Sequence, residues 1–126
     1  FMLEQSYGHE RLYDDLEEAD KWLDQAFHDG RRVGFAFSEI YKGEFKLDKL
    51  YIHPDVQRKG VGGELIRHVA ARAKKLGYPC VILAVNKRND KAIGSYKKYG
   101  FVVREAIVDD IGHGFVMDDF VMEKAL

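Results

Sequence analysis

Apolar residues alternate at Val33, Phe35 and Phe37 and again in the segment from residue 45 to residue 52, with the two-residue period of β-strands. Residues 22–27 are ambiguous between helix and strand, but Asp29-Gly30 is a dipeptide typical of tight hairpin turns, and the alternation beyond it favours a hairpin over residues 22–41. Lys42-Gly43 predicts the next turn. The strand after that turn alternates from residue 45 onward and ends at His53-Pro54, because proline restricts the residue before it. We therefore expect three successive strands joined by tight turns.

The second half of the chain begins with a helical period. Apolar residues recur every three or four positions from Leu65 to Leu76, and Gly77 is a typical helix stop. Residues 80–85 are then apolar without alternation, which is typical of a strand covered on both faces. We accordingly expect Cys80, at the start of this run, to be a core residue.

The order of these elements predicts the fold class. The strand ending near residue 52, the helix after Gly62 and the strand at Cys80 form a strand–helix–strand crossover, which implies a parallel pair. A second helix over residues 90–99 and two strands, 101–109 and 115–123, around a loop at 111–114 complete the chain. We predict an α/β domain with a mixed sheet, flanking helices and an antiparallel C-terminal hairpin.

Composition agrees with one compact domain over residues 1–126, since the chain is 46% hydrophobic and 33% charged. A formal net charge of −1 gives no reason to expect nucleic acid as a partner. The sequence has no apolar run near eighteen residues and no signal-peptide pattern, so we expect no membrane span and a cytoplasmic location. A single cysteine excludes an internal disulfide.

The turn from Gln57 to Gly63, with the sequence Gln-Arg-Lys-Gly-Val-Gly-Gly, is basic and rich in glycine. Glycines remove side chains where a ligand must approach the backbone, and the first N–H groups of a helix lack partners within it. Arg58 and Lys59 add positive charge, so the turn suits a phosphate or pyrophosphate. The plainer alternative is a turn that needs glycine for its dihedral angles alone. The spacing fits neither a Walker loop nor the dinucleotide fingerprint, whose last glycine is replaced by Leu65.

A second polar segment, residues 86–101, begins where the apolar strand ends. In open α/β sheets, ligands bind beyond the carboxyl ends of parallel strands. Asn89 is placed to cap the following helix, and Tyr96 lies two turns further on the same face. Taken alone, these residues would be a cap and an ordinary amphipathic position. Together with the glycine-rich turn, they favour a shared ligand site.

Both segments resemble one family. Gln57-x-x-Gly60-x-Gly62, preceded by Tyr51-Ile52-His53-Pro54, is similar to the acyl-CoA pyrophosphate loop of the GNAT superfamily of N-acetyltransferases. The pattern Asn-x-x-Ala-x-x-x-Tyr-x-Lys-x-Gly-Phe over residues 89–101 resembles the helix and strand that close the acyl-CoA site in those enzymes. The resemblance runs from about residue 32 to residue 126. It implies a GNAT-like fold, acetyl-CoA as co-substrate and direct transfer of the acetyl group to a primary amine.

The front of the chain departs from the family's pattern. Leu12 and Leu16, four residues apart, predict a short amphipathic helix over residues 9–19. The family usually opens with a strand and a helix, and the start at Phe1-Met2 has no obvious equivalent strand. We expect this N-terminal strand and helix to be missing or built differently.

The resemblance implies roles for the quoted positions. By this resemblance, the backbone of the turn would hold the pyrophosphate, the strand end would hold the pantetheine arm, and the helix cap would also contact the cofactor. The residues concerned are Gln57, Arg58, Lys59, Gly60, Val61 and Gly62 of the turn, Tyr51 and Ile52 of the strand end, and Asn89 of the cap. Tyr96 would be the general acid for the leaving thiolate, because a phenol with a pKa of ~10 is protonated at neutral pH. Asp48 would be the base for the amine, with His53 and His113 as rivals and a solvated or paired aspartate as the plainer reading.

The acceptor is predicted from charge. Asp109, Asp110, Asp118 and Asp119 flank the C-terminal hairpin loop and would attract a small basic amine or a polyamine, unless they only solvate an edge strand. Two other functions stay open: a non-catalytic acyl-CoA-binding or sensing module, and a nucleotide-binding regulatory protein. No residues have metal-ligand spacing and no Gly-x-Ser-x-Gly occurs, so neither a metal nor a serine hydrolase is expected. The oligomeric state is also open, a homodimer being one alternative.

Overall fold

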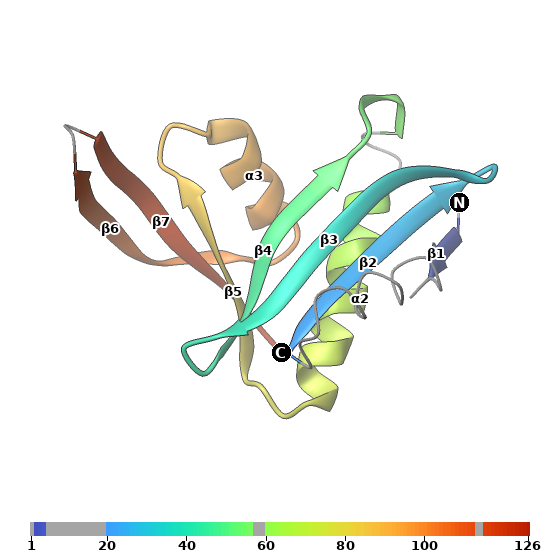
Figure 1. Ribbon diagram of the computed structural model, residues 1–126, viewed down its shortest axis with the longest axis horizontal. Coiled ribbons are helices and arrows are strands. Elements are labelled where there is room, and N and C mark those ends of the chain that lie inside the picture. Colours follow the sequence, from blue (N-terminus) through green and yellow to red (C-terminus); the bar gives the residue numbers. More distant parts are fainter. Residues whose placement is uncertain (1, 5–19, 57–59, 113–114) are drawn as a thin grey trace.

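A computed structural model describes residues 2–4, 20–56, 60–112 and 115–126. Its seven strands form one sheet in the order β1-β2-β3-β4-β5-β7-β6 (Figure 1). The strands are β1 Met2–Glu4, β2 Lys21–His28, β3 Arg31–Tyr41, β4 Glu44–Ile52, β5 Cys80–Asn86, β6 Val102–Gly112 and β7 Phe115–Ala125. The helices are the short 3-10 turn η1 Pro54–Val56, α2 Val61–Lys75 and α3 Asp90–Lys98. Only β4 and β5 pair in parallel among these strands, so the predicted mixed sheet with flanking helices is confirmed.

Tight turns join β2, β3 and β4, as the sequence predicts. Asp29-Gly30 and Lys42-Gly43 each place two successive residues at positive φ, between 50° and 79°. This geometry matches the right-handed twist of the flanking strands, which is why such dipeptides favour two-residue hairpins. The antiparallel registers that follow bring Ala36 opposite both Asp24 and Leu50.

The two ends of the sheet differ from the sequence prediction. A short β1 pairs with β2, where no strand was expected, because three residues are too few to show an alternating pattern. The predicted helix over residues 9–19 lies outside the described residues. At the other end, β6 continues to Gly112, which pairs with Phe115, so the predicted loop at 111–114 is shorter than expected.

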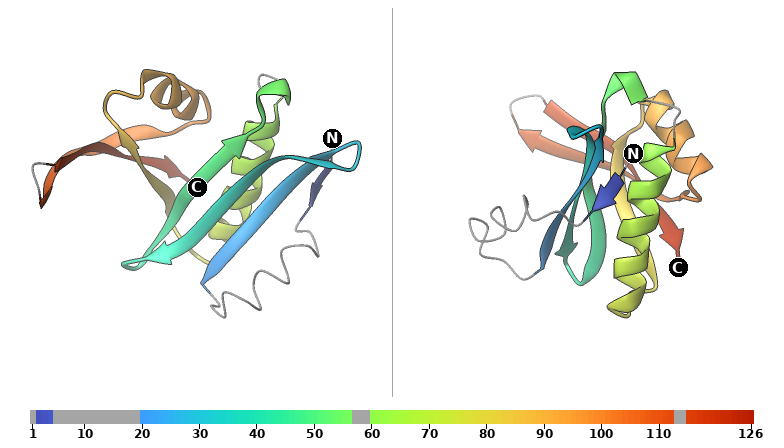
Figure 2. Two further views of the ribbon diagram at one scale, coloured as in Figure 1. Left: turned by 45° about the horizontal axis from the view of Figure 1, so that its top comes forward. Right: turned by 90° about the vertical axis from the view of Figure 1, so that its right-hand side faces the viewer.

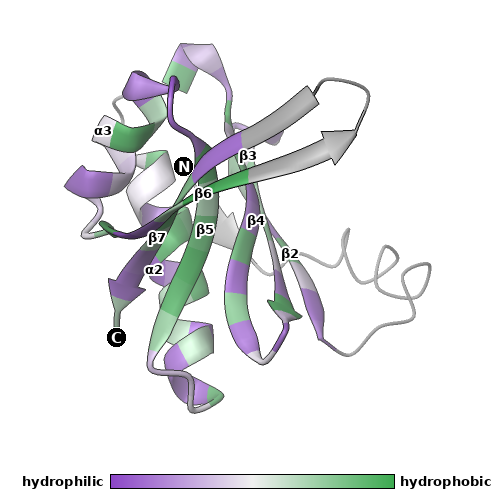
Figure 3. Ribbon diagram, turned by 90° about the vertical axis from the view of Figure 1, so that its left-hand side faces the viewer, coloured by the Kyte–Doolittle hydropathy of each residue, from purple (hydrophilic) through white to green (hydrophobic). Residues whose placement is uncertain are grey.

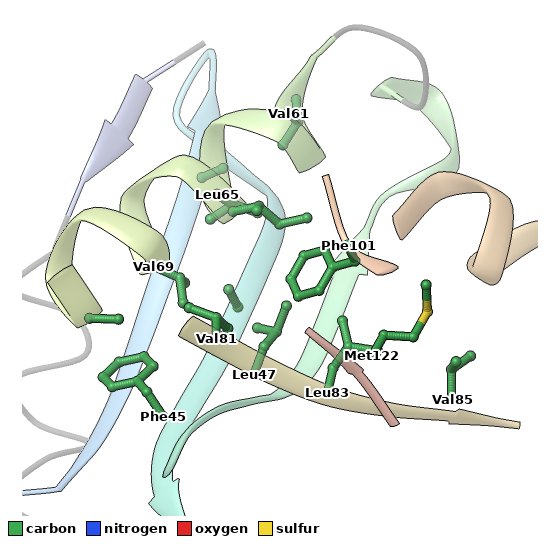
Figure 4. Packing of buried hydrophobic residues seen from close by; sticks show 14 of the residues in the cluster. Phe45, Leu47, Val61, Leu65, Val69, Val81, Leu83, Val85, Phe101 and Met122 are labelled. Atoms are coloured by element: carbon green, nitrogen blue, oxygen red, sulfur yellow. The ribbon is translucent and has the colours of Figure 1, made fainter. Parts of the chain in front are cut away.

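The core lies between α2 and one face of the sheet, and the right-hand view of Figure 2 shows the helix along that face. The buried side of α2 includes Leu65 and Val69, each at most 1% exposed. Figure 4 shows Val69 directed toward Val81 and Phe45 of the sheet, with Leu65 on the side of Phe101. Burial of such a side chain stabilises the fold by roughly 1.5–3 kcal/mol, so the stripe of apolar residues fixes α2 on β4 and β5.

A buried ion pair also holds α2 in place. Asp24 of β2 is fully buried, and its two oxygens accept hydrogen bonds of 2.6 and 2.7 Å from the Arg72 guanidinium. His68 Nε2, one turn earlier on α2, lies 3.5 Å from the same carboxylate. Because breaking such a pair leaves an uncompensated buried charge, at a cost of about 3–5 kcal/mol, the position of α2 over β2 is strongly fixed.

The strand β5 is covered on its second face only in part, not along its whole length as predicted. Figure 3 shows that the strand is hydrophobic along its length; Val81, Leu83 and Val85 alternate into the core, and on the opposite face Ile82 is also buried, at 7% exposed. Ala84 on the opposite face is exposed, and Cys80 is only partly buried rather than a core residue. Apolar composition alone could not show this, because the core face is set by the packing of α2.

Candidate active site between β4 and β5

The parallel strands β4 and β5 separate soon after they meet. Their paired residues are Phe45 with Val81 and Lys46 with Ile82. Beyond these pairs, Figure 1 shows the two strands diverging toward their carboxyl ends. The edge of β4 after Lys46 therefore faces β5 without a registered partner, although β3 covers its other edge. Such an edge can accept an extended ligand through backbone hydrogen bonds.

A β-bulge lies where the strands begin to diverge. In the pairing with β3, Leu47 lies opposite Ser38 and Lys49 opposite Phe37, which leaves Asp48 as the additional residue. A bulge bends its strand and redirects the extra side chain. Because Leu47 points into the core, the neighbouring Lys46 points to the opposite face of the sheet, and Asp48 lies beside it.

Asp48 is close to a cation. Its Oδ1 lies 3.9 Å from Lys46 Nζ, and its side chain is 31% exposed. The pairing matches the plainer reading of a strand aspartate, and the role of Asp48 as a base stays a prediction. Of its rivals, His53 accepts a hydrogen bond at Nδ1 from the Asp55 backbone at 3.1 Å. His113 lies outside the described residues.

The start of α2 has the geometry of an open helix end. Gly60 precedes the helix at φ 81°, and no atom of the described residues lies within 4 Å of the position that a Cβ would take there. The first helical hydrogen bond runs from Glu64 N to Gly60 O, so the N–H groups of Val61, Gly62 and Gly63 have no intrahelical acceptor. The Val61 side chain is 1% exposed and packs in the core, which leaves only its backbone for a ligand. Residues 57–59, which include Gln57, Arg58 and Lys59, lie outside the described part of the chain.

The structure shows a packing requirement at Gly62, and its contact with a cofactor stays a prediction. Gly62 lies within the helix rather than at positive φ, and a Cβ there would meet Tyr99 Oη at 2.6 Å and Cζ at 3.3 Å. Glycine is thus required because the ring of Tyr99, which follows α3 directly, packs against the first turn of α2. This contact brings together the two motifs that the sequence analysis identified.

We expect Gly62→Ala to lower the melting temperature by the effect of overpacking, which typically costs about 1–3 kcal/mol. Adding Tyr99→Phe should restore part of the loss, because the hydroxyl is the nearest atom. Gly94→Ala is the matched control: its Cβ would have no neighbour within 4 Å, so removing a helical glycine should stabilise by about 0.5–1 kcal/mol. Thermal unfolding of the four proteins measures this, and equal melting temperatures for Gly62→Ala and wild type would contradict the packing role.

Unlike α2, the helix α3 is capped by a side chain. Asn89 Oδ1 accepts a hydrogen bond of 3.2 Å from Ala92 N, as the sequence predicts for a cap. At the other end, Lys124 Nζ of β7 donates to the carbonyl of Tyr99 at 2.8 Å. Both ends of α3 are therefore fixed. A contact between Asn89 and a cofactor stays a prediction.

Tyr96 lies on α3 one turn before Tyr99. Its ring is half-buried and packs edge-on against Phe101, with centroids 5.7 Å apart. Burial, and to a lesser degree the neighbouring Tyr99, raises the pKa of the Tyr96 phenol above its ordinary value. Tyr96 therefore keeps its proton at neutral pH, as a general acid must.

The end of β4 presents one aromatic side chain to solvent. Tyr51 is 45% exposed and stacks on Phe35 of β3 with ring centroids 5.7 Å apart. Ile52 is partly buried and packs against the core. Both residues lie in the part of β4 that has separated from β5, so their backbones are where an extended ligand would pass.

The hairpin acids are less available than the sequence suggests. Lys87 Nζ lies 2.5 Å from Asp118 Oδ1, and the backbone N–H of Lys87 donates a hydrogen bond of 3.1 Å to the Asp118 carbonyl. The charge of Asp118 is therefore largely offset. Asp119 pairs with Asn86 of β5 and is half-buried, whereas the side chains of Asp109 and Asp110 lie outside the described part.

Sequence reasoning missed Tyr99, whose hydroxyl lies over the start of α2. Its spacing of three residues from Tyr96 placed it on the same helix face, but no local signal identified Gly62 as its contact. Within the described ranges, no three His, Cys, Asp or Glu side chains group as metal ligands would. The same residues contain no helix long and apolar enough to cross a membrane.

Known proteins similar to this chain are N-acetyltransferases. The sequence model of the acetyltransferase (GNAT) family matches residues 2–101. The chain is 38% identical over 104 residues to the peptidyl-lysine N-acetyltransferase YjaB of Salmonella typhimurium, covering 82% of this chain and 65% of that protein. It is 29% identical over 85 residues to the ribosomal protein bS18-alanine N-acetyltransferase of Escherichia coli, covering 67% and 57%. The chain thus spans less than two thirds of the length of these curated relatives.

Solved structures agree in fold. The PaiA N-acetyltransferase of Thermoplasma acidophilum, crystallised in complex with coenzyme A, is 27% identical with a TM-score of 0.72, and the match covers 94% of this chain and 68% of that one. A GNAT family acetyltransferase of Elizabethkingia anophelis with acetyl-CoA bound matches in fold at 17% identity, with a TM-score of 0.71 and coverage of 96% and 84%.

Proposed function

The chain belongs to the GNAT family of acetyltransferases, and we propose that it transfers the acetyl group of acetyl-CoA to a primary amine. The observation that carries the proposal is the separation of β4 from β5 beside the uncapped start of α2. A slot with a free strand edge suits an extended amide-bearing arm, and a helix N-terminus suits a phosphate. Acetyl-CoA has both groups.

The cofactor would lie with its pyrophosphate at the start of α2. The N–H groups of Val61, Gly62 and Gly63 lack intrahelical acceptors, and the positive end of the helix dipole favours an anion there. Gln57, Arg58, Lys59 and Gly60 would complete the loop around it. The pantetheine arm would follow the free edge of β4 past Tyr51 and Ile52, which places the thioester near Asp48. The Asn89 cap would border the same site.

The proposed reaction has one covalent step. The neutral amine attacks the thioester carbonyl carbon, a C–N bond forms, and the C–S bond breaks without a covalent enzyme intermediate. The thiolate leaves with the proton of the Tyr96 phenol, and the nitrogen gives up its extra proton to a base or to water. Asp48 is our candidate base, because it lies on the open face where the two strands diverge.

The acceptor that we propose is a cationic primary amine. Asp119 adds negative charge beside the carboxyl end of β5, whereas Lys87 offsets Asp118. A free polyamine and a lysine side chain share this chemistry, and one relative is named a peptidyl-lysine N-acetyltransferase. Small basic amines remain our first choice, with lysine-containing peptides as the second arm of the test.

An acceptor screen tests the proposal. Thiol release from acetyl-CoA should rise above the hydrolysis background with a polyamine or a lysine peptide. A melting shift with CoA but no thiol release across the panel would instead support a non-catalytic acyl-CoA-binding module. A shift with ATP that equals the shift with CoA would favour a nucleotide-binding regulator and contradict the proposal.

We expect the KM for a cationic amine to rise with ionic strength, because exposed charges attract less when salt screens them. Asp119→Asn should raise this KM by roughly threefold, with a smaller effect on kcat, the size expected from about 0.5–1 kcal/mol at a partly exposed site. Asp29→Asn is the matched control, since it removes the same charge at the β2–β3 turn. Initial rates measure both effects, and a KM that responds to neither salt nor Asp119→Asn would remove the acid from the acceptor site.

A further inference from the structure

Arg104 is placed by a bulge in β6. In the pairing with β7, Val103 lies opposite Met122 and Glu105 opposite Val121, so Arg104 is the additional residue between them. A bulge redirects the side chain of the extra residue and increases the local twist. Here the redirected guanidinium reaches back across the sheet instead of following the alternation of β6.

The guanidinium contacts three other strands. Nη1 donates to Glu44 Oε1 of β4 at 2.7 Å, and Nη2 donates to Glu123 Oε2 of β7 at 3.0 Å. Nη2 also lies 3.3 Å from Cys80 Sγ of β5. The side chains of Arg104, Glu44 and Glu123 are 28%, 41% and 34% exposed, so these bonds are in partial contact with water. One residue of β6 therefore connects to β4, β5 and β7.

These contacts lie at the closed end of the opening between β4 and β5. Glu44 precedes Phe45 and Cys80 precedes Val81, and Phe45 with Val81 is the first of the two registered pairs. Two pairs alone would hold the angle between the strands weakly. A charged group bonded to residues just outside them adds a second constraint on that angle, because charge-assisted bonds are stronger and more directional than neutral ones.

The cluster keeps its charges at neutral pH. The hydrogen bond from Arg104 lowers the pKa of the Glu123 carboxyl, and its two acidic partners raise the pKa of Arg104. The pair from Arg104 to Glu123 is thus present at neutral pH and is lost only as the pH falls through the lowered pKa of the carboxyl.

We propose that Arg104 is a positioning residue that fixes the separation of β4 and β5, and with it the width of the slot for the pantetheine arm. The inference rests on the proposed function, because the slot is assigned through it. Arg104 acts from a distance, because Tyr51 lies seven positions after Glu44 in β4, which is about 23 Å along a strand. It should therefore affect the pantetheine arm without contacting the pyrophosphate.

The test compares two ligands that differ in the arm. CoA occupies both the helix end and the slot, whereas adenosine 3′,5′-bisphosphate lacks the pantetheine and occupies only the nucleotide end. We expect Arg104→Met to weaken CoA binding by about tenfold, which corresponds to about 1.4 kcal/mol, and to change the Kd of the bisphosphate less than twofold. Isothermal titration calorimetry measures both values. The KM for acetyl-CoA should rise in parallel while kcat changes little.

Three further variants make the result specific. Arg104→Lys keeps the charge, but a lysine cannot bond Glu44 and Glu123 at the same time. The CoA affinity of this variant should therefore lie between that of Arg104→Met and that of wild type. Glu44→Gln removes one anchor and should weaken CoA by a smaller factor, which also tests the inference if Arg104→Met does not fold. Lys75→Met removes a positive charge from an exposed position at the end of α2 and should leave both affinities unchanged.

Equal losses for CoA and the bisphosphate in Arg104→Met would overturn the inference, since they would indicate general destabilisation. Unchanged CoA affinity in both Arg104→Met and Glu44→Gln would overturn it as well, while the proposed function would stand. A wild-type protein that binds neither CoA nor the bisphosphate would overturn the proposed function and the inference together.

Discussion

Replacing Tyr96 with phenylalanine should lower kcat by roughly 100-fold and leave the Kd for CoA nearly unchanged. The substitution keeps the ring that packs edge-on against Phe101 but removes the proton that the leaving thiolate needs. Because burial raises the pKa of this phenol, the wild-type rate should be lost only above the ordinary pKa of ~10, and Tyr96→Phe should lack that alkaline limb. Initial rates across a pH series, with CoA binding measured in parallel, provide the data.

Tyr78→Phe is the control for this variant. Tyr78 packs against Phe45 with ring centroids 5.6 Å apart, outside the proposed site, so losing its hydroxyl should leave kcat within about twofold of wild type. A Tyr96→Phe enzyme that turned over at the wild-type rate would reassign Tyr96 to packing in the core.

Gly60→Val should abolish the rise in melting temperature that CoA produces. At φ 81°, an L-residue is strained by about 1–2 kcal/mol, and a β-branched side chain tolerates this region least. Since no atom of the described residues lies within 4 Å of the Cβ position, the valine would meet none of them and would extend into the space in front of the helix end. Both effects disrupt the proposed anion-binding site at the start of α2 without disturbing the core, so the protein should still fold. Thermal unfolding with and without CoA gives the result.

Gly77→Val is the control that distinguishes backbone strain from loss of the anion-binding site. Gly77 lies just beyond the other end of α2 at φ 90°, and its Cβ position is equally open. This variant should lower the melting temperature of the free protein about as much as Gly60→Val but keep the CoA-induced rise. If CoA stabilised Gly60→Val and Gly77→Val alike, the start of α2 would not be the pyrophosphate site.

Local signals explain why much of the fold could be predicted. Asp29-Gly30 and Lys42-Gly43 specify turns through their own backbone preferences, and the periodic apolar residues of α2 specify the face that it buries. The parallel pair followed from the order of strand, helix and strand. The cap at Asn89 was likewise readable, because its partner lies three residues away.

The features that could not be predicted depend on residues far apart in the chain. Tyr99 meets Gly62 across 37 positions, and neither residue carries a signal for the other. Arg104 reaches Glu44 only because a bulge alters the alternation of β6, and a bulge has no clear pattern in one sequence. The partial exposure of Cys80 depends on which face of β5 the helix covers. Each follows from tertiary packing, which local preferences do not encode.

The two registered pairs between β4 and β5 also bear on how the native protein opens. Strands β2 to β4 are joined by short turns and form a unit of local contacts, whereas β5, β6 and β7 form a second unit. Proteins open locally in cooperative units, and the boundaries of these units lie where few hydrogen bonds connect neighbouring elements. Amide protons along the free edge of β4 should therefore exchange with solvent long before those between β3 and β4. An occupant of the slot would supply the absent strand contacts, making the two units exchange as one.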